Sequence, residues 1–77
     1  VDLLIERGGT LWPIEFKSGA TFHREWLGPL HTWARHAAGA RRGEAMLISA
    51  APGSQWVDGV MAANWREAAG MLAATLS

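Results

Sequence analysis

The sequence predicts a single α/β domain with the element order β-β-α-β-β-α in a chain of 77 residues. Three observations indicate this class: a glycine pair between two alternating apolar segments, apolar residues recurring every three or four positions, and a short, wholly apolar segment between glycine-marked turns. Apolar residues make up 49% of the chain, and no cysteine is present to form a disulfide. This size is near the lower limit for an unsupported core, so we expect the domain to need a partner surface.

The first two strands are predicted as a hairpin over residues 1–17. Gly8 and Gly9 can adopt the positive φ angles that a two-residue turn requires. In this register the numbers of paired residues sum to 17, which sets Leu3 opposite Ile14. Because side chains alternate along a strand, one face of the hairpin is wholly apolar and is expected in the core: Val1, Leu3, Ile5, Trp12, Ile14 and Phe16.

A helix is predicted over residues 22–38, where apolar residues recur at spacings of three and four. Gly28 and Pro29 interrupt it, because a proline inside a helix removes a hydrogen bond and crowds the preceding turn. We therefore expect a kink, or a fresh helix start with Pro29 at its first position, and a helix end near Gly39. The apolar stripe consists of Phe22, Trp26, Leu30, Trp33 and Ala37.

Residues 44–50 are predicted as a central strand, since they are apolar and too short for a helix between two turns. A right-handed crossover would place this strand parallel to residues 11–17. Residues 56–61 are expected to form one further strand. A last helix is predicted from Asn64, which resembles a capping box with Glu67, and its apolar stripe consists of Trp65, Ala68, Ala69, Leu72 and Leu76.

Seven basic and seven acidic residues cancel, so net charge predicts no strong attraction to nucleic acid or to an anionic membrane. No apolar segment approaches the ~20 residues of a membrane span, and a cytoplasmic location is the default expectation. The chain begins at Val1, inside an apolar alternating segment. We interpret residues 1–77 as a single partial domain, the C-terminal fragment of a larger protein, and expect it to self-associate through uncovered apolar area and sheet edges.

Chemistry is expected on the second face of the hairpin. The predicted register sets Asp2 opposite Glu15, with β-carbons about 4.5–5.5 Å apart. At an effective dielectric constant near 20, two like charges ~5 Å apart repel by roughly 3 kcal/mol, which favours a bound cation or a proton between them. Two carboxylates suit a hard divalent ion such as Mg²⁺ or Mn²⁺. Lys17 points to the same side and could stabilise charge on a phosphate or orient an attacking water.

The order Asp2, twelve residues, Glu15-Phe16-Lys17 resembles the core motif of the PD-(D/E)XK nuclease superfamily. The sequence around this motif is similar to that of the C-terminal nuclease-like domain of unknown function found in many bacterial AAA-type ATPases. The similarity is closest over residues 1–21. The resemblance implies a truncated PD-(D/E)XK (restriction-endonuclease-like) core. It further implies that Asp2 and Glu15 ligate a metal, that the Phe16 carbonyl is a further ligand, and that Lys17 is catalytic. Two departures stand out: Val1 replaces the motif's proline, and the helix that precedes the hairpin in the superfamily is absent.

Three functions are open at this point. The first is a metal-dependent phosphodiesterase domain, attached to an ATPase and acting on DNA or RNA. The second is a non-catalytic module that keeps the nuclease fold for docking to, or regulating, the ATPase domain of the same chain. The third is a fragment without a separable function, in which the charged residues form a solvated strand face.

The remaining chemistry-bearing residues are given structural interpretations. His23, His31 and His36 lack the spacing of a helical metal pair and are expected at the surface or its boundary. Five tryptophans could stack bases, as in proteins that bind single strands. Four of them, however, fall on predicted core stripes, and only Trp56 has no assigned face. Arg41 and Arg42 are expected in a solvated loop.

Overall fold

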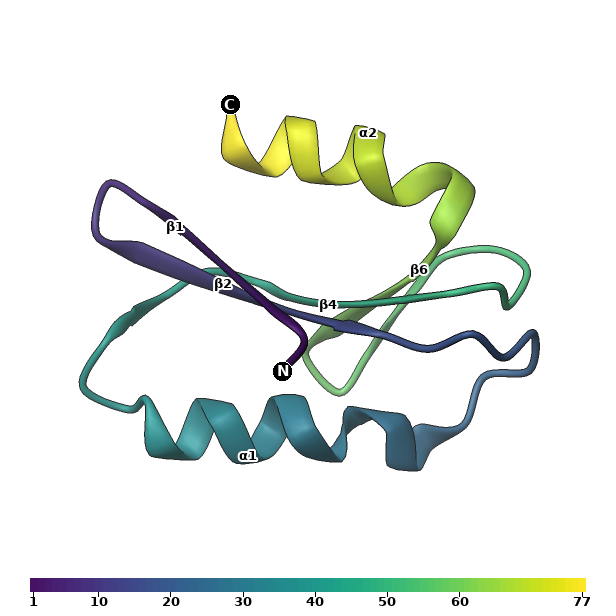
Figure 1. Cartoon of the computed structure of the whole chain (residues 1–77), viewed down its shortest axis with the longest axis horizontal. Helices are drawn as coiled ribbons and strands as arrows, with labels where there is room; N and C mark the ends of the chain where they lie inside the picture. Colours follow the sequence, from purple (N-terminus) through teal and green to yellow (C-terminus); the bar gives the residue numbers. More distant parts are fainter.

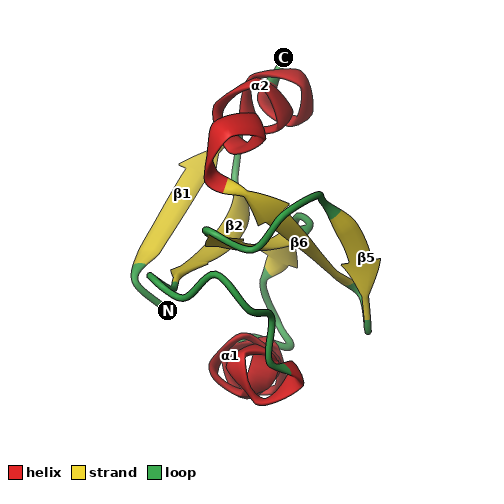
Figure 2. Ribbon diagram, turned by 90° about the vertical axis from the view of Figure 1, so that its right-hand side faces the viewer, coloured by secondary structure: helices red, strands yellow, loops and turns green.

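The computed structural model describes residues 1–77 as three layers, with a six-stranded sheet between two helices (Figures 1 and 2). The strand order is β1-β2-β4-β6-β5, and the short β3 also pairs with β2. The elements are β1 (Leu3–Arg7), β2 (Thr10–Phe16), the 3-10 helix η1 (Arg24–Leu27), α1 (Gly28–His36), β3 (Arg41–Arg42), β4 (Ala45–Ser49), β5 (Gln55–Val57), β6 (Val60–Asn64) and α2 (Trp65–Leu76).

The β1–β2 hairpin has the predicted register from Leu3 to Arg7, and the predicted pair of Asp2 with Glu15 lies outside the paired residues. Leu3 lies opposite Ile14, and the pairing continues to Arg7 opposite Thr10. Gly8 and Gly9 form the turn with φ angles of 59° and 84°. Glycine adopts this backbone conformation without steric cost, and its twist matches that of the flanking strands.

The predicted central strand is also confirmed. β4 lies between β2 and β6 and runs parallel to both, with Ile14 opposite Met46 on one side and Met46 opposite Met61 on the other. The chain crosses from β2 to β4 through η1 and α1. Because helices cover both faces of the sheet, β4 is buried on both sides, which explains its wholly apolar sequence.

The single strand predicted over residues 56–61 is wrong. The chain turns there and forms an antiparallel pair, β5 with β6, in which Trp56 faces Met61. Asp58 and Gly59 make the turn with φ angles of 49° and 80°. Aspartate is among the few residues besides glycine that tolerate positive φ, so Asp58-Gly59 is a strong hairpin turn. The observed order therefore contains two strands more than predicted, the three-residue β5 and the two-residue β3.

The face under α1 holds one half of the core. Leu27, Leu30, Leu47, Val60 and Ala62 form this cluster. The predicted break at Gly28-Pro29 is real: a 3-10 turn ends at Leu27, and α1 begins with proline in its first turn. Full burial of each large side chain here contributes roughly 1.5–3 kcal/mol. Leu27, which the predicted stripe omitted, is among the most buried residues because the 3-10 turn rotates it inward.

The face under α2 holds the other half, formed by Ile14, Met46, Ile48, Ala63 and Ala68. The expectation that one face of the hairpin is core is only partly correct. Ile14 is buried, whereas Val1, Leu3 and Phe16 are exposed. The reason lies in the layer above: α2 packs mainly against β4 and β6, and on β1 only Ile5 packs against this cluster. Conversely, Pro13 and Glu15 are buried, because α1 covers the second face of the hairpin.

Asn64 caps α2 by accepting a hydrogen bond from the Arg66 amide at 2.9 Å. Glu67 does not close the capping box directly. Its Oε1 accepts from the Ser54 hydroxyl at 2.6 Å, and the Ser54 Oγ accepts from the Asn64 amide at 3.0 Å. Ser54, which lies just before β5, thus relays the cap. The prediction that Trp65 joins the core stripe is wrong, because this first residue of α2 is 56% exposed.

Arg41 and Arg42 form β3 rather than a free loop, and the Arg42 guanidinium donates to the Ala34 carbonyl at 2.8 Å. His31 Nε2 lies 3.0 Å from the Asp58 carbonyl oxygen, and Arg24 forms an ion pair with the Asp58 carboxylate. These contacts tie η1 and α1 to the β5–β6 turn. Neither helix is both long and apolar enough to span a membrane.

Candidate functional site

Glu15 occupies the second-to-last position of β2, and its side chain points to the α1 face. Register places it opposite Leu47, a residue of the α1-side core. Only 6% of its surface is exposed. A carboxylate in such surroundings is costly unless cations or donors accompany it. The groups that contact the Glu15 carboxylate therefore decide whether its burial is favourable.

One positive side chain flanks the Glu15 carboxylate. The Nζ of Lys17 lies 3.7 Å from Oε2. The other oxygen, Oε1, is buried and has no hydrogen-bond partner. A buried carboxylate oxygen without such a partner calls for an explanation, and a role as a cation ligand is one.

Asp2 lies one residue before β1 but stays attached to β2. Its amide donates to the Ile14 carbonyl at 3.0 Å, and its Oδ2 accepts from the Phe16 amide at 2.8 Å. The side chain is exposed. The Asp2 carboxylate is therefore held next to the segment from Glu15 to Lys17, with one oxygen bonded to the backbone and the other free.

The carboxylates of Asp2 and Glu15 are the candidate ligands for a hard divalent cation. They do not belong to any group of three or more acidic, histidine or cysteine side chains. Mg²⁺ is commonly held by one or two carboxylates, with waters and substrate phosphate in its other positions. Two carboxylates would meet that minimum, with Glu15 contributing its unpartnered oxygen. The three sequence-predicted residues Asp2, Glu15 and Lys17 are thus brought to one end of the hairpin.

A hollow of about 570 Å³ opens at the carboxyl ends of β2 and β4. In open sheets with parallel strands this is the usual place for ligands. We call it the Lys17 hollow; it is lined by Phe16, Lys17, Ser18, Ile48, Ser49, Ala50 and Trp65. Of the three predicted site residues only Lys17 lines it, because Glu15 points to the α1 face and Asp2 lies outside the lining. The sequence prediction assigned Phe16 and Trp65 to the core. The signal that could have corrected this for Trp65 is its place directly after the Asn64 cap, in the first turn of a helix that covers only part of the sheet.

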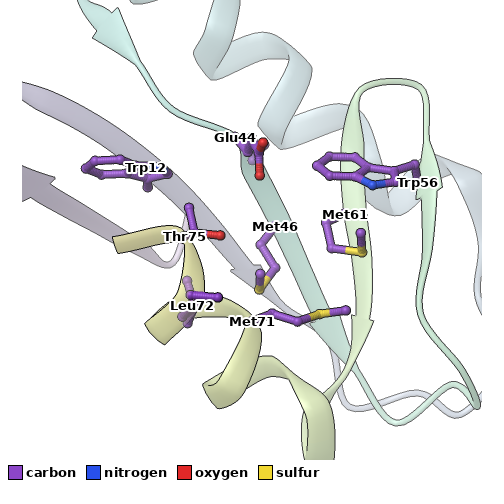
Figure 3. A pocket seen from close by; sticks show the side chains of 10 residues that line it. Trp12, Glu44, Met46, Trp56, Met61, Met71, Leu72 and Thr75 are labelled. Carbon is purple, nitrogen blue, oxygen red and sulfur yellow. The ribbon is translucent and has the colours of Figure 1, made fainter. Parts of the chain in front are cut away.

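A second cavity, of about 210 Å³, lies under the carboxyl-terminal half of α2 (Figure 3). Met46, Met61 and Met71 converge at its centre, and Trp12 and Trp56 lie on either side. The Trp12 ring rests on Gly43, where an added β-carbon would come within 2.0 Å of the indole nitrogen. We call this cavity the methionine cleft. Its only charged lining residue is Glu44, so it has no cation for a phosphate.

Comparison with known proteins found no matching family model, no matching curated protein and no matching solved structure.

Proposed function

We propose that this domain hydrolyses phosphodiester bonds of nucleic acid with the help of Mg²⁺ or Mn²⁺. The observation that carries the proposal is the buried Glu15 carboxylate, which has an oxygen without a hydrogen-bond partner and stands 3.7 Å from Lys17. A purely structural ion pair would gain more from solvent exposure or full hydrogen bonding than from this position. The resemblance of Asp2, Glu15 and Lys17 to the PD-(D/E)XK motif supports the same chemistry.

Each residue has a distinct part in this proposal. The carboxylates of Asp2 and Glu15 and the carbonyl of Phe16 would hold the cation, which when bound supplies Lewis-acid polarisation of a phosphoryl oxygen. The Phe16 amide orients Asp2 through its 2.8 Å hydrogen bond. Lys17, held beside Glu15, places a positive charge at the edge of the hollow, where it would stabilise negative charge that develops on the phosphate and orient the attacking water.

A second candidate is a non-catalytic module that docks to the ATPase domain of the same chain. The observation that favours it is the small ligand set, since one Asp2 oxygen is already bonded to the Phe16 amide. The methionine cleft offers an apolar surface for such docking, because methionine side chains adapt to irregular partners.

The test is cleavage of labelled single- and double-stranded DNA and RNA by the protein, with Mg²⁺ or Mn²⁺ present. Glu15→Gln keeps the shape of the side chain and removes its charge, and Lys17→Ala removes the cation. Each should lower the cleavage rate at least about 100-fold, the usual cost of removing one preorganised charged group. Glu44→Gln is the matched control, because that carboxylate is exposed and lies in the methionine cleft. Absence of metal-dependent cleavage on every substrate would favour the docking module.

A further inference from the structure

Two aromatic side chains stand exposed on either side of the Lys17 hollow. Phe16 is 48% exposed and Trp65 is 56% exposed, although both are large apolar groups that gain free energy from burial. They line one hollow with Lys17. An exposed aromatic pair beside a cation is complementary to a ligand that has a planar group and a negative charge.

The sheet sets the spacing of this pair. Phe16 on β2 lies opposite Ile48 on β4, and Ile48 lies opposite Ala63 on β6, two residues before Trp65. The backbones of β2 and β6 are therefore two strand spacings apart, roughly 9.5 Å. Ile48 forms the apolar floor between them. The volume of about 570 Å³ falls within the usual range for small-molecule sites.

Two positive side chains lie at or near the hollow, although the chain as a whole is neutral and Lys17 is also paired with Glu15. Lys17 lines the hollow, and the Arg66 guanidinium carbon lies 5.0 Å from the centroid of the Trp65 ring. This cation–π contact holds a second positive charge beside the aromatic surface. Single-strand binders use the same combination, in which aromatic rings stack on bases and basic side chains follow the phosphates.

Trp56 provides the contrast within the same molecule. It is exposed to a similar extent, 55%, but it lies at the methionine cleft, whose only charged lining residue is Glu44. A negatively charged strand would be repelled there rather than attracted. Exposure of a tryptophan alone does not make a nucleotide site.

We infer that the Lys17 hollow binds unpaired nucleotides of a single strand: Phe16 and Trp65 stack on bases, and Lys17 and Arg66 contact the adjoining phosphates. The inference rests on the proposed function, in that nucleic acid is the substrate, and it specifies the single strand as the preferred form. Bases in a duplex have their faces covered by their neighbours, so they would have to be unstacked at a cost of a few kcal/mol before entering the hollow.

The test is fluorescence anisotropy with labelled twelve-residue oligo-dT and oligo-U and a labelled duplex, in EDTA at low salt, so that binding is measured without cleavage. Phe16→Ala and Trp65→Ala should each raise the Kd at least about fivefold, the lower limit for losing one stacked base. Trp65→Phe should retain most of the affinity. Trp56→Ala is the matched control and should leave the Kd within about twofold, and the duplex should bind more weakly than either single strand.

Circular dichroism melting of each variant confirms that it is folded at the temperature of the assay. Equal effects of Trp56→Ala and Trp65→Ala, unchanged affinity in Phe16→Ala and Trp65→Ala, or no binding of any strand would overturn the inference. Oligo-dT and oligo-U distinguish DNA from RNA as the source of the strand. Failure of the proposed function is separate: stacking-dependent binding without metal-dependent cleavage would leave the binding site standing and remove the catalytic role of Glu15.

Discussion

The Lys17 hollow and the methionine cleft lie on the same side of the sheet, at opposite ends of its parallel strands. Each has one exposed tryptophan, Trp65 in the hollow and Trp56 in the cleft. The cleft is lined by methionines and has a carboxylate at its rim, whereas the hollow has Lys17 and hydroxyl groups. The charged side chains nearby, rather than the aromatic ring itself, indicate what each cavity can bind.

The two cavities differ because of the path of α2. The helix begins at Asn64, directly after β6, so its first residue stands at the carboxyl ends of the strands. Its second half then extends over the other end of the sheet (Figure 1), where Met71 and Leu72 cover the methionine cleft. The hollow therefore has Lys17 and two serines beside its apolar lining, whereas the methionine cleft is covered by the apolar stripe of α2.

A substitution at Gly43 is expected to have the largest effect, because it disturbs the methionine cleft and leaves the Lys17 hollow unchanged. An added β-carbon would lie 2.0 Å from the Trp12 indole nitrogen, so Gly43→Ala should displace the ring and lower the free energy of unfolding by about 1–3 kcal/mol. Gly39→Ala is the control, since nothing lies within 4 Å of its added carbon. Urea denaturation measures both. A destabilisation of equal size in Gly39→Ala would show that the cleft is not closed by the Trp12–Gly43 contact, and oligonucleotide affinity should remain normal in both variants.

A smaller effect is expected in the Lys17 hollow, on the salt dependence of oligonucleotide binding. Each phosphate contact in a single strand contributes about −0.7 to the slope of log affinity against log salt concentration. Lys17→Ala and Arg66→Ala should each reduce the slope by that amount, which corresponds to about a 2.6-fold smaller loss of affinity between 50 and 200 mM salt. Arg35→Ala, an exposed cation on α1, should leave the slope unchanged. A slope that falls equally in all three variants would indicate non-specific attraction to the whole surface.

The sequence was sufficient to predict local pairing. Gly8-Gly9 and the alternation around it gave the hairpin register, and the uniformly apolar segment 45–49 gave a central parallel strand. Both follow from backbone geometry and short-range pattern. The same register explains why Asp2 lies beside Phe16 and Lys17 beside Glu15 at one end of the hairpin. That these residues form a metal site stays a prediction.

The sequence was not sufficient where burial depends on distant layers. Phe16 and Trp65 have core-type side chains, but both are exposed. Trp65 is the first residue of α2, and this helix lies mainly against β4 and β6, so it leaves Phe16 on β2 uncovered. Glu15 was expected on the face that carries the chemistry, with a solvated face as the alternative, and its burial under α1 was not predicted. The turn at Asp58-Gly59 was not predicted, and it divides the strand predicted over residues 56–61 into β5 and β6. Self-association through the exposed edge strand β1 stays a prediction, which sedimentation at several concentrations would test.

The most direct test of the metal site is thermal unfolding with and without millimolar Mn²⁺. Wild type should gain about 1.4–2.7 kcal/mol at ten to a hundred times the dissociation constant, and each kcal/mol raises Tm by about 4–8 °C in a domain of this size. Asp2→Asn keeps an oxygen that can accept from the Phe16 amide, and Glu15→Gln keeps the shape of the buried group, so both remove charge with little else. We expect these two variants to lose most of the Mn²⁺ response and Glu44→Gln to retain it. Equal responses in all four proteins would contradict a metal site at Asp2 and Glu15.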